Sequence, residues 1–230
     1  MAASPKVSFT RIRRHRLVEA DCCGRLTRVL ERLFARFQRE ALRRLARIHK
    51  QADADLGEDF WAEFQAELAR TFESALRQAF SQAYRDAGGR GPANEIAARW
   101  ARQHAFRAAD HVTEAQRSLA QAALSRWLEE GGTFDDLVAD LGAVFGPNRV
   151  RLIAMTEATR TVARAEVAAW RENPLVGRVR YWTAADEAVC PVCEDDHGRE
   201  LSLAEAEDLI PQHPNCRCFY IPVLEGEEED

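Results

Sequence analysis

Cysteine and histidine residues near the C-terminus have the spacing of a metal site. Cys190 and Cys193 are separated by two residues, and His213 and Cys216 repeat that spacing after the spacer 194–212. Two such pairs, here called the first and the second knuckle, can supply the four tetrahedral ligands that structural zinc requires. The spacer is too short for a hydrophobic core of its own, so we expect Zn²⁺ to hold this segment together.

The sequence offers one ligand too many. Cys218 follows Cys216 by two residues, and in an extended Cys-x-Cys segment the two side chains point to opposite faces. We therefore predict that only one of these two thiols ligates the metal. The other three ligands would be Cys190, Cys193 and His213.

Two other interpretations of these thiols stay open, namely a disulfide pair and free cysteines packed in a core. The N-terminus is polar and basic and lacks the apolar segment of a secretory signal, so we expect a compartment in which disulfides are rare. His197, in Asp196-His197-Gly198, fits a turn and is a weaker candidate ligand.

Known zinc-enzyme motifs do not match this segment. A zinc deaminase requires His-x-Glu before its Cys-x-x-Cys, and none of the 6 histidines is followed by Glu two residues later. The His-Glu-x-x-His motif of metalloproteases is also absent. A His-Asn-His-type nuclease needs a general-base histidine beside an open metal site, and with His213 used as a ligand only His197 lies nearby. We expect no enzymatic activity.

Long helices are predicted upstream of these pairs. Hydrophobic residues recur there at three- and four-residue spacings, with polar residues on the other face. The segments with this pattern are 25–50, 57–86, 92–130 and 148–171. A capping-box pattern at Thr133–Asp136 predicts a further short helix that runs to about Val144.

The hydrophobic period changes after residue 174. Alternating apolar residues predict short strands around 176–181 and 219–223, one on each side of the two knuckles. Ser202 followed by Glu205 predicts a helix of one or two turns between them. The predicted fold is mainly α, with long amphipathic helices followed by a small C-terminal α+β module that contains the zinc knuckles.

The charge of the chain is unevenly distributed. Residues 1–50 hold 14 Lys+Arg against 4 Asp+Glu, and the remaining 180 residues hold 18 against 33, so a basic N-terminal arm precedes an acidic body. Such an arm could contact nucleic acid or an acidic protein surface, or it could be a solvated helix face neutralised by the same chain. The densest basic cluster, and our candidate contact surface, consists of Arg11, Arg13, Arg14 and Arg16.

No apolar run approaches the roughly 20 residues of a membrane span, so we expect a soluble protein that does not contact membranes. At 230 residues and 46% hydrophobic content, the chain can bury one large core or two small ones.

The C-terminal segment resembles the phage Mu F-type minor head protein family, whose members act in head morphogenesis. The resemblance rests on an ordered series of elements over about residues 147–224. They are Thr156-Glu157 with Arg160, then Tyr181–Asp186, Val189–Cys193, Gly198, His213–Cys218 and Ile221–Val223.

The resemblance implies a division into a helical region (1–146), a Mu F-like module (147–224) and an acidic tail (225–230). It further implies a non-enzymatic minor head protein of a tailed phage or prophage. Such a protein would assist procapsid assembly beside the portal, with the portal, major capsid or scaffold proteins as partners. We expect it in the host cytoplasm during assembly and then in the virion, inside the capsid or at the portal vertex.

Contact with DNA through the basic arm would be an additional role. The alternative is a zinc-stabilised nucleic-acid-binding module, with the nuclease less favoured. The acidic spacer between the knuckles would repel phosphate, so in that case the arm would make the contact.

Glu157 and Arg160 are spaced to pair on one helix face. An i,i+3 pair of this kind stabilises a helix by about 0.2–0.5 kcal/mol. We predict a structural ion pair, because no set of neighbouring groups indicates catalysis.

Overall fold

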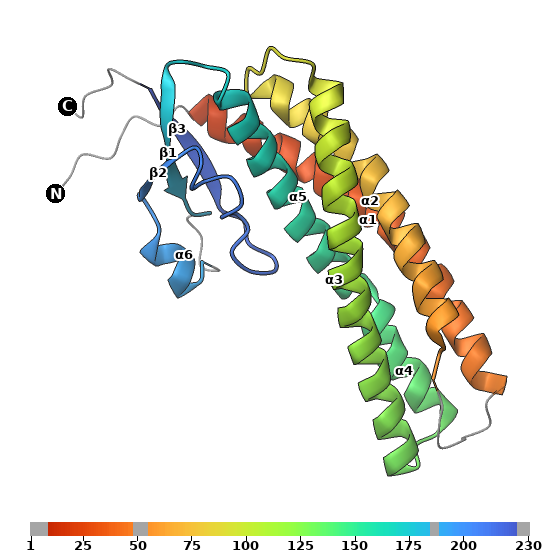
Figure 1. Ribbon diagram of the computed structural model, residues 1–230. Coiled ribbons are helices and arrows are strands. Elements are labelled where there is room, and N and C mark those ends of the chain that lie inside the picture. The colour runs from red at the N-terminus through yellow and green to blue at the C-terminus, as the bar shows by residue number, and fades with distance from the viewer. Residues whose placement is uncertain (1–8, 48–54, 185–188, 225–230) are drawn as a thin grey trace.

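The computed structural model of the chain describes residues 9–47, 55–184 and 189–224. Five helices come first and a small strand region follows (Figure 1). The helices are α1 (Phe9–Arg47), α2 (Glu58–Asp86), α3 (Ala93–Glu130), α4 (Phe134–Phe145) and α5 (Pro147–Trp170). They are followed by β1 (Val176–Trp182), α6 (Pro191–Asp195), β2 (Glu200–Ser202) and β3 (Phe219–Leu224). The prediction of a mainly helical chain with a small C-terminal strand region is confirmed.

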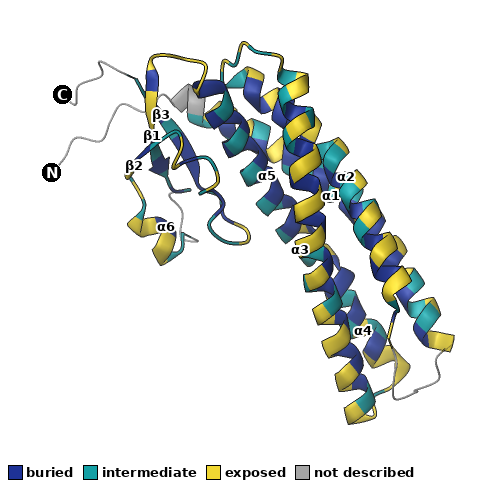
Figure 2. Cartoon of the chain, viewed as in Figure 1, coloured by how far each residue is buried: buried dark blue, intermediate teal, exposed yellow. Residues whose placement is uncertain are grey.

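An aromatic cluster forms the core between the long helices. The ring of Phe64 on α2 lies 5.5 Å from that of Phe34 and 5.0 Å from that of Phe37, both on α1, in edge-to-face contacts. Phe145 at the end of α4 contacts Phe64 at 6.1 Å. Buried residues occupy the sides of the helices that face one another and exposed residues the outer sides (Figure 2). The hydrophobic stripe of each helix therefore packs as its period indicates.

Local signals set several helix ends. Thr133 Oγ1 accepts a hydrogen bond from the backbone N of Asp136, whose carboxylate accepts one from the N of Thr133, so the capping box of α4 is confirmed. Gly131 ends α3 with a φ of 69°, a left-handed conformation that glycine adopts without strain. Pro147 lies in the first turn of α5, where its missing N–H costs nothing.

The basic N-terminal segment is helical from Phe9, whereas the hydrophobic period placed the helix start at 25. The buried face of α1 continues upstream of Leu26 through Cys22, Glu19 and His15. Two of these three residues are polar and form hydrogen bonds with residues of other elements, so the hydrophobic period did not reveal this part of the buried face. Residues 1–8, 48–54 and 225–230, which include the predicted acidic tail, lie outside the described residues.

The C-terminal strands form a three-stranded antiparallel sheet in the order β2-β1-β3. β1 and β3 are the predicted strands, and Val179 in the centre of β1 pairs with Leu201 on one side and Pro222 on the other. β2 was not predicted. The sheet lies beside the C-terminal end of α5 and the start of α1 (Figure 1).

The helix predicted from Ser202 is wrong. The capping hydrogen bonds between Ser202 and Glu205 do form, but residues 203–209 are turns. Arg171 donates to the Leu203 carbonyl and Tyr220 to the Ala206 carbonyl. In a helix these carbonyls would accept hydrogen bonds from backbone N–H groups instead. A helix that was not predicted, α6, begins instead at Pro191.

No helix among the described residues has both the length and the apolar character needed to cross a membrane.

A buried ion pair joins α1 to α5. His15 Nδ1 donates to Glu166 Oε1 at 2.9 Å. Burial lowers the pKa of His15, but the charge and hydrogen bond of Glu166 and the charge of Glu19 outweigh burial, so the pKa is raised above 6.5. The stability from this charge is therefore fully present below about pH 6.5 and is lost as the pH rises through the folded-state pKa.

His15→Gln should therefore destabilise the protein most near pH 6 and progressively less at higher pH. The pH-dependent part of the loss should be about 1.4 kcal/mol for each unit by which the folded-state pKa is raised. Urea unfolding of both proteins between about pH 6 and pH 9 measures the difference. His111→Gln, an exposed position on α3, is the control. A His15→Gln difference that stays constant over this range would contradict the charged pair.

Candidate metal centre

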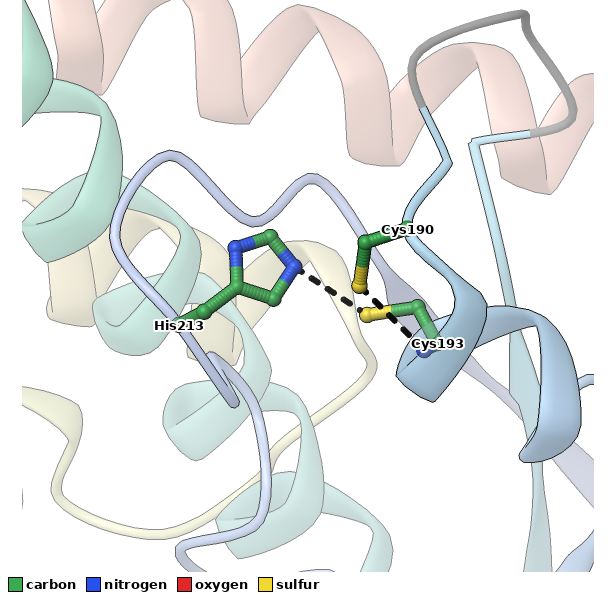
Figure 3. A group of neighbouring side chains, drawn as sticks. All are labelled: Cys190, Cys193 and His213. Atoms are coloured by element: carbon green, nitrogen blue, oxygen red, sulfur yellow. Dashed lines mark hydrogen bonds between the residues drawn. The ribbon is translucent and has the colours of Figure 1, made fainter.

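The two knuckles meet beside the sheet. The ligating atoms of Cys190, Cys193 and His213 lie within 4.8 Å of one another (Figure 3). Cys193 also belongs to a second group of the same tightness, with Cys216 and Cys218. Cys193 therefore belongs to both groups, and the other four predicted ligand residues divide between them.

Each knuckle is shaped by local backbone interactions. In the first, Cys190 is the N-cap of α6 and its sulfur accepts a hydrogen bond from the Cys193 backbone N at 3.4 Å. In the second, the Cys216 N donates to the His213 carbonyl at 3.2 Å. Asn215 completes this turn with a φ of 63°, a left-handed conformation that Asn tolerates better than most residues. Both knuckles thus bring two ligand side chains to the same side of a turn.

The prediction that Cys216 and Cys218 point to opposite faces is wrong. The sulfur atoms of both lie within 4.8 Å of each other and of Cys193, and both residues are buried. The expectation assumed an extended strand, but β3 begins only at Phe219 and residues 216–218 are irregular.

Hydrogen bonds orient the ligand atoms. The Cys193 sulfur lies 3.2 Å from His213 Nε2 and 3.9 Å from the Cys216 sulfur, and it accepts a hydrogen bond from the Tyr181 hydroxyl at 3.3 Å. His213 Nδ1 lies 2.9 Å from the Pro214 carbonyl, so a proton on Nδ1 leaves the Nε2 lone pair free to ligate.

The thiols of the cluster differ in acidity. A hydrogen bond from Cys218 lowers the pKa of Cys216 to about 5. The same interaction raises the pKa of Cys218, while burial raises the pKa of Cys193 to about 11. Cys216 is therefore the most acidic of these three thiols.

The separations around Cys193 fit zinc. At Zn–S distances of about 2.3 Å and Zn–N distances of about 2.0–2.1 Å, tetrahedral ligands lie roughly 3.5–3.8 Å from one another. The separations of 3.2 and 3.9 Å around Cys193 are close to these values. All six cysteines of the chain are free, so the structure contains none of the disulfides left open by the sequence.

His197 lies apart from these groups. Its Nδ1 is 2.8 Å from the Thr183 hydroxyl, and its ring packs against Trp182 with centroids 4.4 Å apart. It joins β1 to the turn after α6 and is in neither of the two ligand groups.

The second knuckle is hydrogen-bonded directly to α5 and α1. The Thr159 hydroxyl lies 2.9 Å from the Cys216 carbonyl and 2.8 Å from Glu19 Oε1. Asn215 N donates to Thr156 Oγ1 at 2.9 Å, and Arg16 near the start of α1 donates to the Arg217 carbonyl at 3.2 Å. Thr159 had no role of its own in the sequence analysis, because its hydrogen-bond partners are distant in the sequence.

Glu157 and Arg160 lie in contact, with Nε 3.6 Å from Oε1. Glu157 has a closer partner that was not predicted, since its Oε2 lies 2.5 Å from His104 Nε2 on α3. The His104 ring in turn stacks on Trp100 at 4.8 Å.

The four candidate arginines have different surroundings. Arg13 and Arg14 are exposed. Arg16 donates to Glu19 and to the Arg217 carbonyl, and its guanidinium lies 5.0 Å from the Phe219 ring centroid. The Arg11 side chain lies outside the described residues.

Comparison with protein families gives one match. A family model described as "Phage Mu protein F like protein" matches residues 32–221. The match includes both knuckles and extends far upstream of residue 147, into α1. No curated protein and no solved structure matches the chain.

Proposed function

The chain belongs to the Phage Mu protein F-like family, and on this premise we propose that it is a non-enzymatic minor head protein of a tailed phage or prophage. The family suggests a role in phage head morphogenesis and interaction with other head proteins. The family match over residues 32–221 is the observation that carries the proposal. We place the protein beside the portal during procapsid assembly, and inside the capsid or at the portal vertex afterwards.

The proposed cofactor is one structural Zn²⁺. Cys190, Cys193, His213 and Cys216 are the proposed ligands, because the sulfur of Cys216 lies 3.9 Å from that of Cys193 and its turn includes His213. Cys218 is the neighbour that hydrogen-bonds the cluster. Four protein ligands leave no open position for substrate or water, which supports a structural rather than a catalytic metal.

The helices would supply the surface for partner proteins. On α3, Phe106 and Leu119 are 65% and 45% accessible, and they are the positions of this helix at which we propose to test partner contact. Arg13 and Arg14 are the residues best exposed for contact with DNA.

Co-expression with the portal protein of the same genome tests the proposal. Affinity purification at moderate salt, with zinc quantified in the eluate, should recover the portal together with about one zinc per chain. A zinc-loaded chain that ignores the portal but retains nucleic acid would instead favour the alternative, a zinc-stabilised nucleic-acid-binding module. Salt dependence and an Arg13→Ala/Arg14→Ala variant would then locate that contact.

Thr159→Val should loosen the metal centre. The substitution removes the single hydroxyl shared by the buried Cys216 carbonyl and Glu19 Oε1, which should cost about 1–3 kcal/mol. We expect faster transfer of zinc to a chromogenic chelator. Thr161→Val is the matched control, because this equally buried hydroxyl bonds only the Glu157 carbonyl one turn earlier in α5. Equal rates of transfer from both variants would show that the contact does not support the metal centre.

A further inference from the structure

A pocket of about 460 Å³ lies between α3, α5 and the turn of the second knuckle. Arginine and histidine side chains from both helices line it, together with Trp100. They are Arg107, His104 and His111 on α3, and Arg149 and Arg160 on α5. Pro214, which belongs to the second knuckle, forms part of the same wall.

The arginines of this pocket have hydrogen-bonding capacity that the protein does not use. Arg149 is half-buried, and Nε donates at 2.7 Å to Gln116, a neutral partner. Burial lowers the pKa of the Arg149 guanidinium, which is the direction expected for a cation without a compensating charge. Among the described residues, no carboxylate forms an ion pair with Arg149 or Arg107.

Arg160 is also incompletely satisfied. Its Nε is buried and makes no hydrogen bond, because Glu157 lies 3.6 Å away and is engaged by His104. A buried donor without an acceptor is costly, so an acceptor supplied by a ligand would stabilise this side chain. The three guanidinium groups therefore converge on a site that favours an anion.

The pocket also has an apolar side. Val112, Leu152, Ile153 and Trp100 line it beside the arginines. An apolar wall of this kind can accommodate an aliphatic side chain. Tryptophan and arginine are also among the residues that contribute most binding free energy at protein interfaces.

We propose that this pocket binds an acidic peptide segment, with one or two carboxylates held by the arginines and an adjoining apolar side chain packed against Trp100. The source of the segment, a partner head protein, rests on the proposed function. Charge complementarity favours a peptide over nucleic acid. The three arginines are partly offset by Glu157 and by Asp208 at the same pocket, which leaves a modest positive charge. A concave site of this volume also admits side chains but not a duplex backbone.

Fluorescence anisotropy with a labelled hexapeptide of alternating Glu and Leu tests the proposal. The wild-type protein should bind this peptide at moderate salt and should bind the matched Gln-Leu peptide at least tenfold more weakly. Arg149→Gln and Arg107→Gln should each weaken binding about tenfold. Arg107 is exposed, so its substitution leaves the core intact even if Arg149→Gln disturbs Gln116. Arg151→Gln, an exposed arginine two residues from Arg149 and outside the pocket, should bind as wild type.

Absence of binding up to millimolar peptide would overturn the proposal. So would equal affinity of the wild-type protein for the Glu-Leu and Gln-Leu peptides, or equal affinity of wild type and Arg107→Gln for the Glu-Leu peptide. A 20-nucleotide DNA that displaces the peptide from wild type but not from Arg107→Gln would also overturn it, in favour of nucleic acid. Recovery of the portal with wild type and with Arg107→Gln distinguishes failure of the pocket proposal from failure of the proposed head role. Equal recovery of the portal with both would retain the head role and reject the pocket as the portal contact. Arginine-dependent peptide binding with no portal recovered would retain the pocket and reject the head role.

Discussion

Cys193→Ser is expected to abolish metal binding and to unfold residues 176–224. Its sulfur is the only one shared by both groups of ligand residues, and it also accepts the hydrogen bond of the buried Tyr181 hydroxyl. Structural zinc contributes about 10–16 kcal/mol of apparent binding free energy in small zinc modules, far more than this small sheet can replace. Limited proteolysis should therefore cleave the C-terminal module rapidly, while the fragment containing α1 to α5 persists. Metal analysis of the same sample should give less than about 0.1 zinc per chain.

Cys23→Ser is the control for this experiment. Cys23 is a half-buried thiol on α1, outside both ligand groups, so the variant should keep its zinc and its resistance to protease. Cys190→Ser should resemble Cys193→Ser. If the Cys190 and Cys193 variants both retain native protease resistance in residues 176–224, the metal does not hold the module together.

Phe64→Ala should cause the largest loss of stability in the helical region. The ring is fully buried and contacts aromatic rings on α1 and α4, so its removal leaves a cavity where three helices meet. Truncation of a buried phenylalanine costs about 3–5 kcal/mol. Denaturant unfolding followed by circular dichroism at 222 nm measures this loss. Zinc content under native conditions should not change, because the metal ligands lie in a separate hydrophobic cluster.

Phe106→Ala provides the matched comparison. This phenylalanine lies on α3 but is 65% exposed, so its truncation should change the free energy of unfolding by less than about 0.5 kcal/mol. A Phe64→Ala loss below about 1 kcal/mol would contradict the aromatic core. Loss of zinc from Phe64→Ala under native conditions would show that the two clusters unfold together.

The helices and the main strands could be predicted because their signals are local. The stripe that includes Phe60, Phe64, Leu68 and Phe72 has the helical period, and all four side chains are buried in α2. Thr133 and Asp136 start α4 through a hydrogen-bonding pattern complete within four residues. The ligand cluster could be predicted for a similar reason, since each knuckle is a single turn.

Features that depend on distant partners could not be predicted. His15 and Glu19 interrupt the apolar stripe of α1, and their buried partners Glu166 and Thr159 lie more than a hundred residues away in the sequence. The helix predicted after Ser202 failed because Arg171 and Tyr220 bond its carbonyls. The arginine pocket combines residues from two helices and a loop, which no single sequence window contains.

Contacts between the second knuckle and the helices would give the proposed zinc a wider role than folding one module. Thr159 bonds the Cys216 carbonyl, and Pro214 forms part of the arginine pocket. Loss of zinc should therefore remove one wall of that pocket and part of the support of α1. A partner that binds the pocket should prefer the metal-loaded protein.

Peptide mass spectrometry of purified phage heads tests the central claim most directly. Heads would be isolated from cells that express the complete set of head genes with either wild-type chain or Cys193→Ser. The account predicts that peptides of this protein are recovered from procapsids or heads with the wild-type chain, and that Cys193→Ser reduces their amount at least tenfold. Absence of the wild-type protein from both procapsids and heads, while it accumulates in the lysate, would contradict a role as a zinc-stabilised head protein.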